Sequence, residues 1–444
     1  MKRDILEKLV EWSKKPTRKP LVLSGARQVG KTWALKEFGR VAYKNTAYFN
    51  FDANPELSLV FEPDFNVERI VLALSAFAGF DIVPNETLII LDEIQLCPRA
   101  LTSLKYWCEN APGYHIAAAG SLIGLSMNEG TGYPVGKTES FTLFPMSFGE
   151  FLAALGEDRL VDLLEDAAMM KMFAAKLTES LRYYFYVGGM PAAVATFVET
   201  KSLRSVREIQ ENILTDYERD FSRHAPKNMQ PKIRALWRSL PVQLDRTDRR
   251  FVAAQVDGKL RARDLHDAFE WLEGSGLAYR VWNVTKPAIP LSAYRNHLFK
   301  LFSVDVGLLA AQSGLSAKVL IGGDKAFTEF KGALCEQFVQ QELRTINRSV
   351  PYYWTTANSQ CEIDVLYEID GSVVPIEVKA ETNLKAKSLK SYLERFHPEL
   401  AIRTSLADFK VVVRTADVPL YGLTAFVKRE SGRDHGGREM GFVV

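Results

Sequence analysis

Residues 21–36, LVLSGARQVGKTWALK, join an apolar run to a stretch of helical periodicity through the spacing GxxxxGK followed by Thr. Glycine at both ends of this spacing allows a tight turn whose backbone N–H groups point inward, and the helix that follows offers its positive N-terminus. Such a loop suits the phosphates of ATP. We expect Lys31 to reach the β- and γ-phosphates and Thr32 to bind Mg²⁺. The expected loop consists of Gly25, Ala26, Arg27, Gln28, Val29 and Gly30.

A second apolar run, TLIILDEIQ at residues 87–95, ends in two acidic residues. Unbroken apolar strands are typical of buried parallel sheets, which present the residues after each strand at one edge. We expect Asp92 to complete the Mg²⁺ shell and Glu93 to act with Lys31 in catalysis, by polarising the attacking water. Without the loop before it, the acidic pair would be interpreted as a helix cap. Ser121 follows a third apolar run, and we expect it to contact the γ-phosphate or the water.

Strands and helices alternate from about residue 20 to 150, which predicts an α/β fold with a parallel, doubly wound sheet. The chain has 444 residues, too many for one hydrophobic core, so further domains are expected. No apolar run reaches the roughly 18 residues of a membrane span, and the first residues do not resemble a signal peptide. The 4 cysteines form no CxxC pair and are typical of reduced thiols. We therefore expect a cytoplasmic protein with no membrane partner.

Two further motifs, TLFPMSFGEFL at 142–152 and YVGGMPAAV at 186–194, add to GARQVGKT and LDEIQ. Together they resemble a bacterial and archaeal family of AAA-type P-loop ATPases, related to the STAND switch ATPases, that carry a restriction-endonuclease-like C-terminal domain of unassigned function. The resemblance runs over nearly the whole chain and implies that Gly189 and Pro191 lie against the adenine. Many members have an arginine before the PMSF-type segment, where this chain has Lys137. An arginine finger, Arg99 or another, is not assignable from the sequence.

The helical pattern and the resemblance predict four domains. The helix, turn and helix after residue 225, followed by two strands, favour a winged helix. Arginines in LDRTDRRF at 244–251 and KLRARDLH at 259–266 supply charge for DNA contact, but such runs are commonly solvated faces, and packing of this domain against the ATPase domain is the favoured interpretation. The expected domains are an AAA-type ATPase domain at 1–154, a helical lid at 155–224, a winged-helix-like domain at 225–315 and a restriction-endonuclease-like domain at 316–444.

The C-terminal third contains two segments of period two, EIDVLYEI at 362–369 and SVVPIEVKA at 372–380, joined by an Asp-Gly turn. This pattern predicts a hairpin on which Asp364 lies across from Glu377, while Lys379 shares the face of Glu377. With Glu336 from the preceding helix, these residues match the acidic signature of the restriction-endonuclease-like fold. We expect Glu336, Asp364 and Glu377 to hold Mg²⁺ or Mn²⁺ and Lys379 to act as a catalytic residue on the metal-bound water. The alternative is an ordinary surface hairpin.

The helix at 332–346 precedes these strands, and a helix at 385–396 and a strand at 408–415 follow them, which predicts the order α-β-β-β-α-β. The sequence thus predicts an ATP-hydrolysing ATPase coupled to a nuclease-like domain that cleaves or binds nucleic acid. The alternative is a switch or scaffold ATPase whose silent C-terminal domain binds a partner protein. Homo-oligomerisation stays open in both readings.

Overall fold

The computed structural model describes most of the chain. The described residues are 1–128, 134–245, 249–322, 328–346, 349–356, 360–381 and 386–432, and the side chains of 126–128 and 328–330 are excluded. Of the arginine-rich segment 244–251, residues 246–248 lie outside this description.

The first sheet has five parallel strands in the order β2-β3-β4-β1-β5. Its strand residues alternate between two cores: Leu21 and Leu23 of β1 face one, and Val22 faces the other. Helices cover both faces, so the predicted α/β fold is confirmed. The strands are β1 Leu21–Ser24, β2 Asn45–Asn50, β3 Thr87–Asp92, β4 His115–Ala119 and β5 Glu139–Thr142, and the helices are α1 Ile5–Lys14, α2 Lys31–Ala42, α3 Val67–Ala78, α4 Pro98–Asn110 and α5 Ile123–Asn128.

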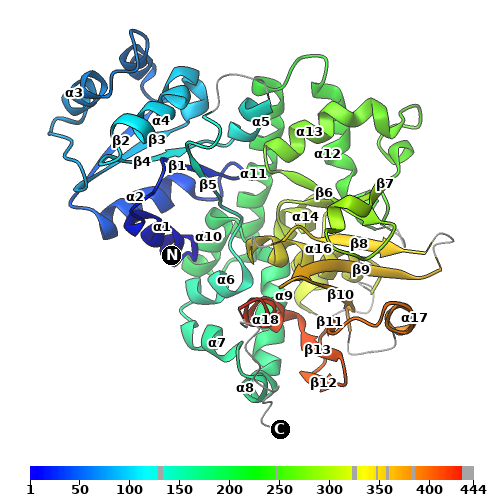
Figure 1. Ribbon diagram of the computed structural model, residues 1–444. Coiled ribbons are helices and arrows are strands. Elements are labelled where there is room, and N and C mark those ends of the chain that lie inside the picture. The colour runs from blue at the N-terminus through cyan, green and yellow to red at the C-terminus, as the bar shows by residue number, and fades with distance from the viewer. Residues whose placement is uncertain are drawn as a thin grey trace.

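A helical region follows the first sheet, and its longest member is α11, a 22-residue helix. In Figure 1 this helix runs between the first sheet and the second half of the molecule. The helices are α6 Phe148–Ala154, α7 Asp158–Leu163, α8 Ala167–Met172, α9 Ala174–Val187, α10 Pro191–Thr200, α11 Leu203–His224, α12 Gln230–Leu244 and α13 His266–Gly274. Among the described residues, no helix is long and apolar enough to cross a membrane.

The second sheet is mixed and has eight strands in the order β12-β13-β11-β10-β9-β8-β6-β7. Its strands are β6 Ala278–Val284, β7 Arg295–Ser303, β8 Tyr352–Thr355, β9 Glu362–Ile369, β10 Ser372–Val378, β11 Ala401–Ser405, β12 Lys410–Val412 and β13 Thr415–Pro419. The pair β6–β7, expected as a wing, is one edge of this sheet because β6 bonds to β8. The sheet therefore continues across the boundary expected at 315/316.

The helices of the second half are α14 Val306–Gln312, α15 Ala317–Ile321, α16 Thr328–Ile346, α17 Lys387–Phe396 and α18 Leu423–Glu430. The hairpin β9–β10 has the predicted antiparallel register, with Ile376 opposite Val365. The prediction of a single strand at 408–415 is wrong. Two short strands, β12 and β13, meet there, and the strand after α17 is β11, which pairs in parallel with β10. Its five residues, AIRTS, are too short and mixed to show a strand pattern in the sequence.

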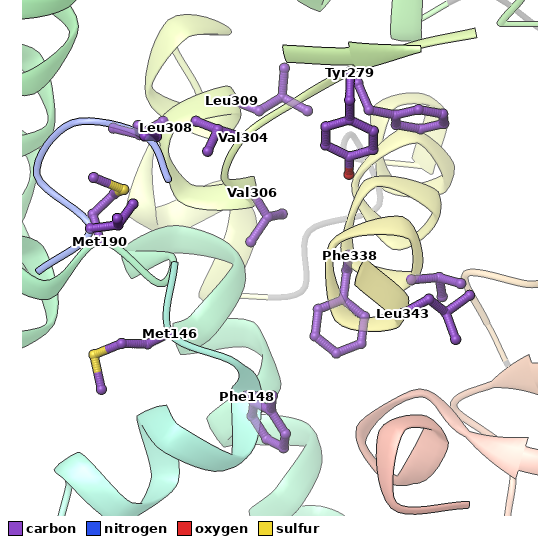
Figure 2. Close-up of a cluster of buried hydrophobic side chains, with 14 of the residues drawn as sticks. Met146, Phe148, Met190, Tyr279, Val304, Val306, Leu308, Leu309, Phe338 and Leu343 are labelled. Carbon is purple, nitrogen blue, oxygen red and sulfur yellow. The ribbon is translucent and has the colours of Figure 1, made fainter. Parts of the chain in front are cut away.

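One hydrophobic core connects the regions expected as separate domains. Figure 2 shows labelled side chains from four of these regions gathered together: Met146, Phe148, Met190, Tyr279, Val304, Val306, Leu308, Leu309, Phe338 and Leu343. The ring of Phe338 on α16 lies 6.3 Å from that of Phe148 and 5.8 Å from that of Tyr184. Helix α16 is therefore packed directly on the end of the first domain and on the helical region.

Candidate nucleotide site

The loop 25–30 connects β1 to α2 and requires glycine at its first position. Gly25 has φ of +143°, and a Cβ there would come within 2.2 Å of the carbonyl oxygen of Leu143. Gly30, with φ of +95°, immediately precedes α2. Residues other than glycine rarely adopt these backbone angles. The two glycines thus allow the loop to turn closely around the N-terminus of α2.

Lys31 begins α2 and is almost fully buried, at 7% exposure. Its Nζ donates hydrogen bonds to the carbonyl oxygens of Gly25 at 2.9 Å and Ala26 at 2.8 Å. Burial lowers its pKa to about 8, against the opposing effect of Glu93 and Asp92. The ammonium therefore lies inside the loop, bonded to oxygens that phosphate oxygens are able to replace.

Asp92 ends β3 and lies beside Thr32. The Thr32 hydroxyl donates to Oδ2 of Asp92 at 2.7 Å, and the Tyr48 hydroxyl donates to the same oxygen at 2.9 Å. Magnesium takes oxygen ligands and commonly binds through one or two protein side chains together with substrate phosphates. The adjacent hydroxyl and carboxylate of Thr32 and Asp92 fit this ion.

Glu93 and Ser121 follow neighbouring strands, β3 and β4, and line one cavity with Arg27. Glu93 has φ of +53°, which turns its side chain out of the strand direction, and its Oε2 accepts a hydrogen bond from Gln95 at 2.6 Å. The structure thus brings together the predicted base, the predicted γ-phosphate contact and the loop. The end of α11 closes the same cavity with Asp220, Arg223 and His224.

Helix α11 also binds the loop itself, which the sequence did not indicate. Arg27 forms an ion pair with Asp220, and Gln28 Nε2 donates to Asp216 Oδ2 at 3.2 Å. The Tyr217 hydroxyl donates to the carbonyl oxygen of Arg27 at 2.9 Å. The signal in the sequence is the run DYERD at 216–220, in which Asp220 is four positions from Asp216 and three from Tyr217, so that these residues share a helix face. Nothing in the sequence shows what this face contacts.

The segment with Gly189 and Pro191 lies next to the loop. Pro191 begins α10, and a Cβ on Gly30 would lie 3.5 Å from its Cγ. Gly189 packs more deeply: its N–H donates to Asp305 Oδ2 at 2.6 Å, and a Cβ there would approach the carbonyl oxygen of Met146 to 2.2 Å. Close packing against Met146 and Asp305 therefore explains by itself why a glycine is needed at 189. The adenine contact stays a prediction.

Of three further basic residues, Arg3 contacts the loop, whereas Lys137 and Arg99 pair with other parts of the domain. Arg3, which the sequence did not single out, donates to the carbonyl oxygen of Val29 at 2.9 Å. Lys137 pairs with Glu109 at 2.8 Å, and Arg99 donates to the carbonyl oxygen of Phe61 at 2.7 Å. Neither Lys137 nor Arg99 is among the residues lining the cavity at Glu93.

The residues predicted as a C-terminal metal site lie on α16, β9 and β10. Glu336 accepts from Lys300 Nζ at 2.7 Å and pairs with Arg249. Asp364 Oδ2 accepts from the N–H of Val378 at 2.8 Å. Lys379 Nζ lies 2.7 Å from Glu377 Oε1.

As arranged, Glu336 does not fit a divalent metal ion, because cationic side chains bind both of its oxygens. Within the described residues, no group of three or more His, Cys, Asp or Glu side chains is placed to hold a metal. Glu377 keeps one buried oxygen, Oε2, with no hydrogen-bond partner among these residues. Burial and the nearby Asp364 raise the pKa of Glu377 to about 7.

Residues 17–152 match the family described as AAA domain. With the loop, Lys31 and the acidic end of β3, this match defines the first part of the chain as an AAA-type P-loop ATPase domain. Residues 178–319 match a domain of unknown function, DUF8612, and residues 331–421 match another, DUF4143. The restriction-endonuclease-like domain therefore stays a prediction.

Several solved structures are similar to the chain. The Walker-type ATPase PABY2304 of Pyrococcus abyssi is 14% identical with a TM-score of 0.45, over 70% of this chain and 95% of its own. The Aeropyrum pernix ORC1 protein, solved in complex with DNA, is 13% identical with a TM-score of 0.32, over 70% and 91%. The Aeropyrum pernix ORC2 protein is 15% identical with a TM-score of 0.33, over 77% and 94%. No curated protein matches the chain in sequence.

Proposed function

We propose that the protein binds ATP with Mg²⁺ at the loop 25–30, hydrolyses it, and uses the nucleotide state to change how α11 holds the loop. The observation that carries this proposal is the convergence of Lys31, Thr32, Asp92, Glu93 and Ser121 at one edge of the first sheet. The groups proposed to bind phosphate, to bind Mg²⁺ and to activate water come from separate elements and lie together there, which supports ATP hydrolysis.

Each group has a role that follows from its position. Lys31 exchanges its two carbonyl partners for phosphate oxygens. Thr32 and Asp92 would hold Mg²⁺, which supplies charge neutralisation at the phosphates. Glu93, in the cavity with Ser121, takes the proton of the attacking water, and Ser121 positions that water or the γ-phosphate. Pro191, beside Gly30, is placed to pack on the base.

The loop contacts of α11 support a switch. The guanidinium of Arg27 is paired with Asp220, so incoming phosphates compete with that carboxylate for it. A change in this pairing moves the end of α11, and α11 as a whole also contacts α14 near the second sheet. Nucleotide binding is thereby passed to the rest of the molecule.

Two outputs remain for the C-terminal part: nucleic-acid cleavage and partner binding by a silent domain. The pairing of Glu336 with Lys300 and Arg249 favours the silent domain, because it removes one of the three predicted metal ligands. The carboxylate pair of Asp364 and Glu377 is what still supports cleavage.

Nucleotide binding and turnover in three proteins test the ATPase. We expect Lys31→Ala to lose ATP binding, and Glu93→Gln to bind ATP but lose at least about 10²-fold in turnover, the usual contribution of a general base. Glu37→Gln, on the exposed side of α2, serves as the control and should behave as wild type. Hydrolysis retained by Glu93→Gln would remove Glu93 from the mechanism.

Incubation with single- and double-stranded DNA and RNA and Mn²⁺, with and without ATP, tests the output. If the C-terminal domain is catalytically silent, the wild-type protein should cleave none of these substrates. Cleavage that Asp364→Ala and Lys379→Ala both abolish would instead establish the nuclease.

A further inference from the structure

Lys300 is a lysine without solvent exposure in the middle of β7. Its ammonium donates to Glu336 Oε1 at 2.7 Å and to Glu362 Oε1 at 2.6 Å, and it lies 5.0 Å from the centre of the Tyr353 ring. A buried ammonium is costly unless paired and hydrogen-bonded. The two carboxylates, from α16 and β9, provide that pairing.

Arg249 completes the arrangement from a different segment, ahead of β6. It forms an ion pair with the second oxygen of Glu336, whose side chain has no exposure. The segments that supply the cations lie within residues 178–319, and those that supply the carboxylates lie within 331–421. The ion pairs therefore join the two parts of the chain that match separate families.

The cluster contains four carboxylates and three cations within electrostatic reach of one another. Glu336, Glu362, Asp364 and Glu377 influence one another and face Lys300, Arg249 and Lys379. Carboxylates that converge from a helix and two strands normally need a bound cation to offset their repulsion. Here protein side chains supply the offsetting charge at Glu336 and Glu362.

We propose that Lys300, supported by Arg249, is a resident cation that occupies a latent divalent-cation site between Glu336 and Glu362. It takes the place of a metal ion, ties β7 to α16 and β9, and keeps Glu336 out of any metal shell. Removal of the ammonium should open this site to Mn²⁺. The inference does not depend on the ATPase function proposed above.

Thermal unfolding of the full chain, without nucleotide and with or without millimolar Mn²⁺, tests the site. We expect Mn²⁺ to leave the Tm of the wild-type protein unchanged, because Lys300 keeps the ion out of this cluster. Lys300→Met should lower the Tm in the absence of metal, because it removes the cationic partner of Glu362 and of one oxygen of Glu336, and Mn²⁺ should restore part of the loss. Lys300→Arg should keep the wild-type indifference to Mn²⁺. Lys390→Met, a lysine 80% exposed on α17, is the matched control and should change neither value.

Calorimetric titration with Mn²⁺ gives the second readout. Lys300→Met should bind Mn²⁺ about tenfold or more tightly than wild type, because a positive charge close to the site has been removed. An Mn²⁺ response of Lys300→Met no greater than that of wild type overturns the proposal. If Lys300→Met does not fold, wild type and Glu336→Gln decide: equal Mn²⁺ binding supports the resident cation, and Mn²⁺ bound by wild type but lost in Glu336→Gln refutes it.

Discussion

At the scale of single residues, Lys31 combines two properties that oppose each other. Phosphate binding needs its positive charge, yet burial beneath the loop favours its neutral form and lowers its pKa to about 8. Thr32 and Asp92, the two side chains that would share Mg²⁺, are already joined by a hydrogen bond of 2.7 Å. The nucleotide site is thus set by where each side chain lies rather than by unusual residue types.

The Lys31 pKa gives a pH prediction. The ammonium loses its proton as pH rises through about 8, so the affinity for a non-hydrolysable ATP analogue should be constant below that value and fall above it. One pH unit above the pKa the loss should be about tenfold. Lys31→Arg stays protonated across this range and should bind with little pH dependence. Calorimetry between neutral pH and about pH 9 measures both; equal pH dependence in the two proteins would contradict the assignment.

At the scale of secondary-structure elements, α11 is the helix that contacts the nucleotide loop and is therefore placed to respond to its state. Its side chains at 216, 217 and 220 contact Gln28 and Arg27 from one face. The helix is 22 residues long, so one end contacts the loop while its body packs on α10, α12 and α14. A rigid element that contacts both the nucleotide loop and the second half is suited to transmit a displacement.

We expect Asp220→Asn to strengthen binding of the ATP analogue by about threefold to fivefold, because Arg27 is released toward the phosphates. The effect is small because Arg27 is 40% exposed and such ion pairs contribute at most about 1 kcal/mol. Glu208→Gln removes an exposed ion pair from the same helix and serves as the control. Unchanged or weaker affinity of Asp220→Asn, measured by calorimetry, would exclude competition between Asp220 and the phosphates.

At the scale of the whole molecule, the chain is held together by a shared core and a continuous sheet rather than by linkers. The core around Phe338 includes side chains from the end of the ATPase domain, the helical region and the second sheet (Figure 2). The eight-stranded sheet, in turn, joins strands from either side of residue 315. These regions should therefore unfold together.

Phe338→Ala tests this expectation. Loss of a fully buried aromatic side chain should cost about 3–5 kcal/mol in the free energy of unfolding. Because Phe338 contacts Phe148, denaturant unfolding followed at the ATPase domain should shift by the same amount as unfolding followed at the second sheet. Leu72→Ala, at a leucine 73% exposed on α3, should have little effect. Two separate transitions, of which only one moves, would show that the regions are independent.

The sequence by itself determined the elements whose signal is local. The loop 25–30, the acidic end of β3 and the hairpin β9–β10 each follow from a few neighbouring residues, because glycine conformations, buried parallel strands and period-two alternation act over short distances. The α/β class followed from repetition of these local signals. Strand β11 was not predicted, because its five residues are too few and too mixed to show a clear period.

The tertiary structure alone decided which charges meet. The ion pairs of Arg27 with Asp220 and of Lys300 with Glu336 join residues that are far apart in the chain. A lysine or arginine in a sequence looks the same whether water or a carboxylate surrounds it. Arg249 belongs to a segment for which both DNA contact and packing within the protein were open, and it lies against Glu336. Charge pairing depends on distance in space and on burial, so only the folded chain assigns Lys300 and Arg249 to the carboxylate cluster.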